Sequence, residues 1–203
     1  MSGKRKRTNK NRIPLAPKAI NAELLIAEVS VGNMFYAWLL VIPVLIEQGY
    51  ATRERILELW DATNDYISNP QVVAGSVSAP TKYISNIIGL PEPYPAIDFR
   101  TVHTEGDLES IRRKLKKNAL HAGLCIIALG MKALDLYSNE ELRSIFFNVD
   151  LTLAEIDRGV TSYDKLLETV QGYGIRLSQG ASDMELSLAE GTSSPESDNL
   201  GAP

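Results

Sequence analysis

The feature that most constrains the fold is residues 119–134, ALHAGLCIIALGMKAL, which are apolar on nearly every side of a helix. Only His121 and Lys132 interrupt this run with polar side chains. A helix that is apolar all round is one buried by its neighbours. Residues 34–46, MFYAWLLVIPVLI, have the same character. We therefore predict that two buried helices cross in one core.

Both ends of the chain differ from its middle in charge. Residues 1–18 carry +7 and residues 182–203 carry −5, which leaves −6 for the middle because the total is −4. Such segments bury too little apolar surface to offset the entropy lost on ordering. We predict a disordered basic arm over residues 1–18, a helical domain over residues 19–177, and a disordered acidic tail over residues 178–203.

Capping signals divide the domain into two helical hairpins, over residues 20–68 and 105–157. Thr52 is placed to cap the second helix of the first hairpin. Ser138 with Glu141 forms an S-x-x-E capping box for the second helix of the other hairpin. The side chains of such residues accept hydrogen bonds from the free backbone N–H groups of a helix's first turn. The hairpins and their caps predict an all-α fold with no sheet of any size.

The remaining elements are shorter or interrupted. Gly32 and Pro43 predict a break or kink in the first helix. A Pro-rich connector, residues 69–104, joins the hairpins and contains one short helix near residues 81–88. A further short helix is predicted over residues 162–171. The fold class is then a single bundle of about five helices.

The two hairpins keep the same residue classes at an offset of 86 residues. Trp38 corresponds to Leu124 and Thr52 to Ser138, although identical residues are nearly absent. Two interpretations stay open. Either the hairpins arose by duplication and pack about a pseudo-two-fold axis, or they share the ordinary pattern of any two capped hairpins.

Cys125 is the single cysteine and follows His121 by four residues, so both lie on one helix face. One cysteine makes no internal disulfide, which favours a reducing compartment. The pair offers too few metal ligands, since the other histidine, His103, falls in the connector. A thiolate is disfavoured in so apolar a run. We predict a core histidine beside a buried thiol, with no metal, no cofactor and no thiol catalysis.

A stripe of acidic residues follows the outward side of the helix after Thr52. Its spacing of 4, 3 and 4 residues places the carboxylates on one face. One interpretation is an ordinary solvent-exposed helix face. The other is a partner-binding face whose carboxylates resemble a row of phosphates. The candidate partner-binding residues are Glu54, Glu58, Asp61 and Asp65.

Basic residues gather at two places, in the arm and in the first half of the helix that begins after Thr104. Either group is suited to bind a polyanion without sequence preference, or to serve only as a solvated surface. The candidate residues for nucleic-acid or polyanion binding are Lys4, Arg5, Lys6, Arg7, Lys10, Arg12, Arg112, Arg113, Lys116 and Lys117, with Lys114 between them.

No sequence motif of known catalytic chemistry is present. The chain contains no phosphate-binding glycine loop, no nucleophile elbow, no C-x-x-C pair and no H-E-x-x-H. We therefore expect a protein that is not an enzyme, with a hydrolase of unseen site as a third hypothesis. The basic head is followed by no cleavable apolar segment, and residues 34–46 are too short to span a bilayer. The expected location is the cytoplasm.

The second half of the chain resembles small early or accessory proteins of phages and prophages of Gram-positive bacteria. The resemblance is carried by residues 119–177, including LYSNEELRSIF and DRGVTSYDKLLETVQGYGI. It implies a non-enzymatic phage accessory protein in the host cytoplasm. Our first hypothesis is that it binds a host protein, such as a defence nuclease, and inhibits or redirects it. The alternative is a nucleic-acid accessory factor, and a homodimer is compatible with either.

Overall fold

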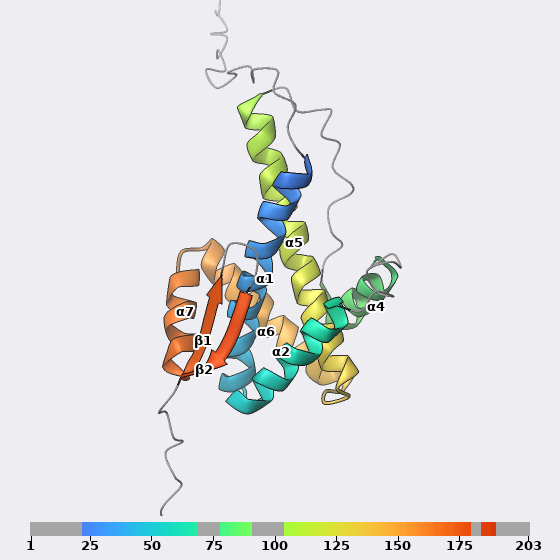
Figure 1. Ribbon diagram of the computed structural model, residues 1–203, viewed down its shortest axis with the longest axis vertical. Helices are drawn as coiled ribbons and strands as arrows, with labels where there is room; N and C mark the ends of the chain where they lie inside the picture. Colours follow the sequence, from blue (N-terminus) through green and yellow to red (C-terminus); the bar gives the residue numbers. More distant parts are fainter. Residues whose placement is uncertain (1–21, 69–77, 91–103, 180–183, 190–203) are drawn as a thin grey trace, which may run out of the picture.

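The computed structural model describes residues 22–68, 78–90, 104–179 and 184–189. Within these ranges the chain is mostly helical, which confirms the all-α prediction (Figure 1). The predicted disordered arm, residues 69–77 and 91–103 of the connector, and residues 190–203 of the tail lie outside the described residues. The elements are α1 Ala22–Glu47, α2 Arg53–Ser68, α4 Ser78–Ile88, α5 Glu105–Ala133, α6 Asn139–Asp157, α7 Tyr163–Gly172, β1 Ile175–Gln179 and β2 Met184–Leu188.

The helices begin where the sequence places their caps. At the start of α5, the Asp107 backbone N–H donates to Thr104 Oγ1 over 3.2 Å, and the Thr104 N–H donates to Asp107 Oδ2 over 3.0 Å. Ser138 and Glu141 form the same reciprocal pair before α6. Each pair satisfies two backbone donors that the first helical turn leaves unbonded. The predicted starts of α5 and α6 are confirmed.

Of the predicted break or kink in the first helix, the break is wrong. Helix α1 runs without a break from Ala22 to Glu47, with Pro43 inside it. Proline removes one backbone hydrogen bond from a helix. Here α1 packs against α5, α6 and α7, and the residues around Pro43 are buried. Packing of this extent outweighs the tendency of proline to end a helix.

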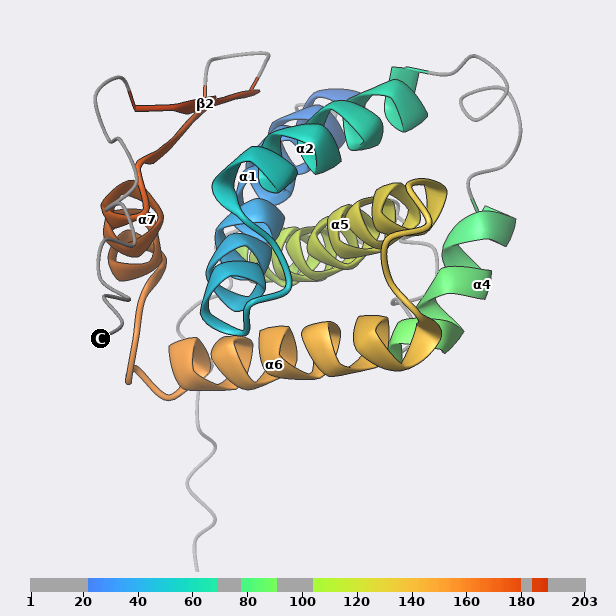
Figure 2. The ribbon, with the colours of Figure 1, turned by 90° about the horizontal axis from the view of Figure 1, so that it is seen from below.

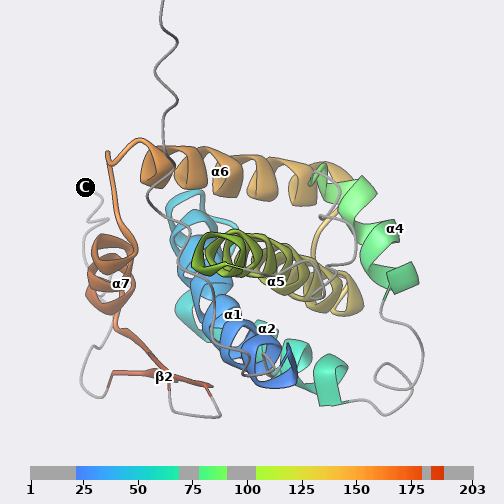
Figure 3. The same ribbon diagram turned by 90° about the horizontal axis from the view of Figure 1, so that it is seen from above.

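The two apolar helices cross in one core, as predicted. Trp38, Leu39 and Leu40 of α1 are at most 1 % exposed, and Leu124 and Ile127 of α5 are at most 2 % exposed. Figures 2 and 3 show α2 and α6 on opposite sides of the α1–α5 pair, with α7 at one edge and α4 at the other. The N-terminal part of α5 projects from this body beside that of α1 (Figure 1).

The two hairpins pack in an approximately two-fold arrangement. Helix α2 packs on α5, and reciprocally α6 packs on α1. At the crossing of the long helices, a Cβ atom added at Gly123 would lie 3.1 Å from the Cβ of Ala37. These positions are 86 residues apart, so equivalent residues of the two hairpins meet each other. Such self-contact is what residues beside a two-fold axis make.

The turns of the hairpins also correspond, but they do not decide whether the hairpins arose by duplication. Gly49 and Asp135 occupy equivalent positions with φ of 70° and 50°. Gly159, between α6 and α7, has φ of 72° and lies in a similar turn. Because this turn occurs three times, it is a common helix–loop–helix connection, and duplication stays a prediction. In all three turns the residue with positive φ is followed three residues later by a capping residue, namely Thr52, Ser138 and Ser162.

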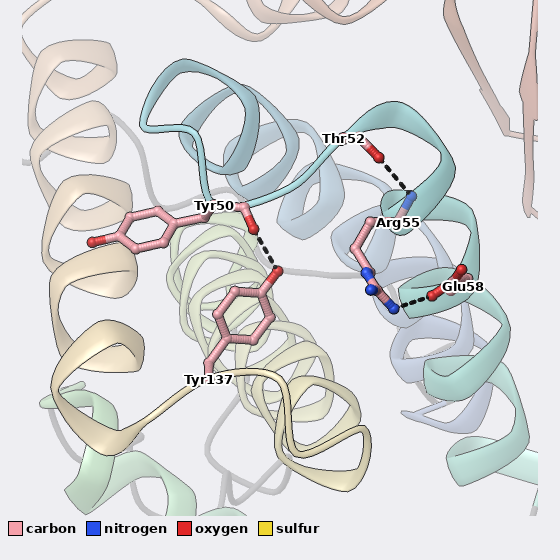
Figure 4. A network of polar contacts seen from close by, with 5 residues as sticks. All are labelled: Tyr50, Thr52, Arg55, Glu58 and Tyr137. Atoms are coloured by element: carbon pink, nitrogen blue, oxygen red, sulfur yellow. Dashed lines mark hydrogen bonds and ion pairs between the residues drawn. The ribbon is translucent and has the colours of Figure 1, made fainter.

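The two hairpin turns contact each other at the end of the bundle. The Tyr137 hydroxyl donates to the Tyr50 carbonyl oxygen over 3.2 Å, and the ring centroids are 6.4 Å apart (Figure 4). Tyr137 is 6 % exposed. This contact joins the ends of the two hairpins, which are 87 residues apart in the chain.

A small antiparallel sheet forms where none was predicted. Strand β1 pairs with β2, with Ile175 opposite Leu188 and Leu177 opposite Leu186. The predicted disordered tail from residue 178 is therefore wrong for the end of β1 and for β2. The physical reason is an alternation of apolar and polar residues with period two, which gives the hairpin one apolar face. That face is used against α7, α1 and α2.

Candidate functional site

The predicted histidine–cysteine pair is part of a longer hydrogen-bonded chain. His121 Nδ1 lies 3.8 Å from Cys125 Sγ, and His121 Nε2 lies 3.2 Å from Ser85 Oγ of α4. The Ser85 hydroxyl in turn donates to the Leu90 carbonyl oxygen over 3.2 Å. Sequence reasoning missed Ser85, because its contact with His121 depends on where α4 packs. The chain joins α4 to α5.

This chain of contacts has the features of a structural link. Burial raises the pKa of the Cys125 thiol to about 12, so the thiol is protonated at neutral pH and is a poor nucleophile. Ser85 is 6 % exposed, which leaves its hydroxyl little access to a substrate. Within the described residues no group of three or more His, Cys, Asp or Glu side chains could hold a metal ion. His103 lies outside the described residues.

The acidic residues of α2 are exposed along one side of the helix, as the spacing predicted. Glu58 forms an ion pair with Arg55, within the same helix (Figure 4). A hydrogen bond to its backbone N–H, and one to the Thr52 side chain, hold the pKa of Glu54 below its ordinary value. The carboxylate of Glu54 is therefore ionised at neutral pH. The exposed members are Glu54, Glu58, Asp61 and Asp65, and we refer to them as the acidic face.

The basic residues of α5 lie on the part of that helix that projects from the body (Figure 1). Arg113, Lys116 and Lys117 are exposed and share one side of the helix, while Arg112 is half-buried and Lys114 is exposed on a flank. We call these five residues the basic cluster. The predicted arm, which would extend this charge, lies outside the described residues.

The acidic face and the basic cluster do not form one site. Helix α2 meets α5 at Gly130, where a Cβ atom would lie 2.5 Å from Thr63 Oγ1. The basic cluster ends thirteen residues before Gly130, which is about 20 Å along the helix axis. The acidic face and the basic cluster are therefore two separate surfaces.

A third surface, on α6, was not predicted. Phe147 is 63 % exposed and Leu151, one helical turn further on, is 49 % exposed. Beside Phe147 a hollow of about 440 Å³ opens between α6 and the residues that follow α4. Its lining residues are Ile88, Gly89, Leu90, Arg143, Ser144, Phe146, Phe147 and Asp150.

Only part of this surface has a sequence signal. Phe146 and Phe147 are adjacent, so one of the two must face away from the core that Phe146 fills at 1 % exposure. The hollow itself depends on α4, whose end lies against α6. The Arg143 Nε–H donates to the Ile87 carbonyl oxygen over 2.9 Å, and no sequence pattern indicates that contact.

Comparison with known proteins found no match. No family model matches this chain, and no curated protein and no solved structure matches it either. Among the described residues, no helix is both long enough and apolar enough to cross a membrane.

Proposed function

We propose that the protein is a non-catalytic phage or prophage accessory protein that binds a host protein in the host cytoplasm. The observation that carries this proposal is the acidic face of α2. Its carboxylates extend over about 16 Å of helix, since eleven residues separate the first from the last. The face is supported from behind by Ile56 and Leu59, both fully buried. The carboxylates are thus carried by a packed helix, with Glu58 paired to Arg55 of the same helix.

Such an array suits a partner with a basic groove. A nuclease holds the phosphates of its substrate with Lys and Arg side chains. Carboxylates spaced along a rigid helix would occupy that groove and exclude the substrate. The proposed mechanism is therefore competitive inhibition of a host defence nuclease by electrostatic mimicry of phosphates. Binding of this type weakens as the salt concentration rises.

The test compares capture from a Gram-positive host lysate by the full chain and by a variant with a neutralised acidic face. The variant carries Glu58→Gln, Asp61→Asn and Asp65→Asn, and it leaves Glu54 in place because that residue lies in the first turn of α2. We expect a stoichiometric partner that the full chain recovers and this variant loses.

The control carries Glu155→Gln, Asp157→Asn and Glu168→Gln, which are exposed acids outside α2. It has the same net charge as the first variant and should still recover the partner. If both variants lose the partner equally, the loss reflects total charge and not the acidic face. If neither the parent nor the control recovers a partner, the proposal is contradicted.

A second candidate function is supported by the basic cluster. Its exposed cations project from the body on α5, where a nucleic acid would meet no acidic side chain of α2. In this function the protein is a nucleic-acid accessory factor that uses the basic cluster together with the arm. Electrostatic binding to phosphates has an affinity that falls steeply with salt.

Gel-shift titrations at several salt concentrations test this second function. Deletion of residues 1–12, or the variant Arg113→Gln, Lys116→Gln and Lys117→Gln, should weaken binding and reduce the salt dependence by about one unit of slope for each lost phosphate contact. The absence of any shift at low salt would eliminate it. The matched control removes three exposed cations elsewhere, Arg158, Lys165 and Arg176, each replaced by Gln.

A further inference from the structure

The outward face of α6 presents an apolar projection beside an apolar recess. Phe147 and Leu151 are on the same side of the helix, at 63 % and 49 % exposure. The hollow adjoining Phe147 has an apolar floor, since Ile88 is 4 % and Phe146 is 1 % exposed. Among the described residues no side chain fills this apolar recess or covers the aromatic ring beside it. Apolar surface left in contact with water costs free energy that a binding partner would recover.

Opposite charges flank this hollow. Arg143 and Asp150 both line it, both are exposed, and they are seven residues apart on α6. That spacing is two helical turns, or about 10 Å, so the two side chains are too far apart to pair with each other. In the described part of the chain neither takes part in an ion pair. The hydrogen bond from Arg143 Nε to the Ile87 carbonyl holds the guanidinium at the rim.

These features are arranged symmetrically about the middle of the face. The midpoint between Arg143 and Asp150 falls between residues 146 and 147, beside the exposed ring. In an antiparallel helix pair related by a two-fold axis at that midpoint, Arg143 of one copy faces Asp150 of the other, and Asp150 faces Arg143. Both contacts lie within about 5 Å of the axis along the helix, so they depend little on the crossing angle.

We propose that α6 is the interface of a homodimer, in which a second copy of this chain packs antiparallel on the face formed by Arg143, Phe147, Asp150 and Leu151. Each Phe147 ring projects into the hollow of the other copy. Two symmetric ion pairs, each between Arg143 of one copy and Asp150 of the other, flank the rings. A two-fold interface requires one surface that carries both halves of every contact.

The charge pattern is what selects a second copy over another occupant. An unrelated apolar peptide could make apolar contacts with the hollow and with Phe147. To pair with Arg143 and Asp150 as well, it would need an acidic and a basic side chain at the matching spacing. A second copy supplies them by symmetry. A standard interface buries about 800 Å² on each partner. The proposed interface consists of one helix and its flank, so we expect it to bury less. We therefore expect a weak, concentration-dependent dimer.

The first test measures the molar mass of the full chain by sedimentation equilibrium from about 1 μM to about 1 mM, a range that spans weak association. The mass should rise from one chain to two. Phe147→Asp should weaken association at least about 30-fold, as expected for a central aromatic contact. The matched control is Val160→Asp, since Val160 has the same 63 % exposure but lies beyond the end of α6; its association should equal that of the parent.

The second test exchanges the charges. Arg143→Asp alone, or Asp150→Arg alone, opposes like charges across the interface and should weaken self-association about tenfold or more. The chain with both substitutions should regain it. An equimolar mixture of the two single variants should also associate, because each copy then offers what the other lacks. Circular dichroism checks that every variant is folded.

Three results would overturn the proposal. The first is a chain that stays monomeric over the whole concentration range. The second is a dimer that neither Phe147→Asp nor the charge reversals weaken. The third is a monomer whose capture of a host protein is abolished by Phe147→Asp, which would assign this face to that partner. If Phe147→Asp fails to fold, the mixture of single charge variants decides the question alone.

Discussion

The close approach of α5 to α2 makes a quantitative prediction for Gly130→Ala. A Cβ atom at position 130 would lie 2.5 Å from Thr63 Oγ1 and 3.3 Å from Thr63 Cα. Thr63 is fully buried, and its hydroxyl donates to the Leu59 carbonyl oxygen over 2.7 Å. The hydroxyl therefore has a bonded position from which the new methyl group would displace it.

The expected change is a balance of two effects. Alanine is favoured over glycine inside a helix by about 1 kcal/mol. Against this, adding a methyl group to a filled contact costs about 1–3 kcal/mol, and displacing the Thr63 hydroxyl costs about 1 kcal/mol more. The steric cost should exceed the gain because both neighbours are helical backbone or held by it. Gly130→Ala should lower the free energy of unfolding by about 1–3 kcal/mol.

Urea denaturation followed by circular dichroism measures this change, and a double-mutant cycle identifies its cause. In a Thr63→Ala background the nearest oxygen is gone, so Gly130→Ala should be neutral within about 0.5 kcal/mol or stabilising. The control is Gly172→Ala at the end of α7, where an added Cβ has no neighbour within 4 Å. That change should be neutral or stabilising by up to about 1 kcal/mol.

A Gly130→Ala protein that is more stable than the parent would refute this reasoning. The same conclusion would follow if the cost persisted unchanged in the Thr63→Ala background. In the first case the two helices would not approach as closely as the contact at Gly130 implies. In the second case the cost would come from an atom other than the Thr63 hydroxyl, such as Thr63 Cα.

Further predictions concern the caps, a turn and the buried thiol. Asp135→Gly should raise the free energy of unfolding by about 0.5–1 kcal/mol, because Asp135 holds a φ of 50° where the equivalent residue is Gly49; a loss in urea denaturation would contradict this. Ser138→Ala should lower it by about 1 kcal/mol by removing the N-cap. Hydrogen bonds from Ser138 lower the pKa of Glu141, so its stabilisation is present at neutral pH and is lost as the pH falls through the lowered pKa; Glu141→Gln should destabilise at pH 7 and have little effect near pH 2. Cys125 should resist a thiol reagent in the native protein at about pH 8 and react once the chain is unfolded, since burial keeps its thiol protonated; fast labelling of the native protein would disprove its burial.

The candidate surfaces were predictable to different degrees. The exposure of Glu58 and Asp61 follows from helical spacing alone, because the opposite side of α2 is apolar. The contact between Ser85 and His121 was not predictable, since it joins residues 36 positions apart through the packing of α4. The same packing creates the hollow beside Phe147. Surfaces formed within one helix can be inferred from sequence, whereas those formed between helices require their relative placement.

The sequence by itself determined that the chain is mostly helical, where α2, α5, α6 and α7 begin, and which two helices are buried. Those properties depend on local capping chemistry and on periodicity, and both are written along the chain. Tertiary structure decided the rest. It kept α1 continuous through Pro43, because burial on several sides outweighs one lost hydrogen bond. It also ordered the β1–β2 hairpin, since two five-residue strands become stable only when their apolar face packs on helices already in place.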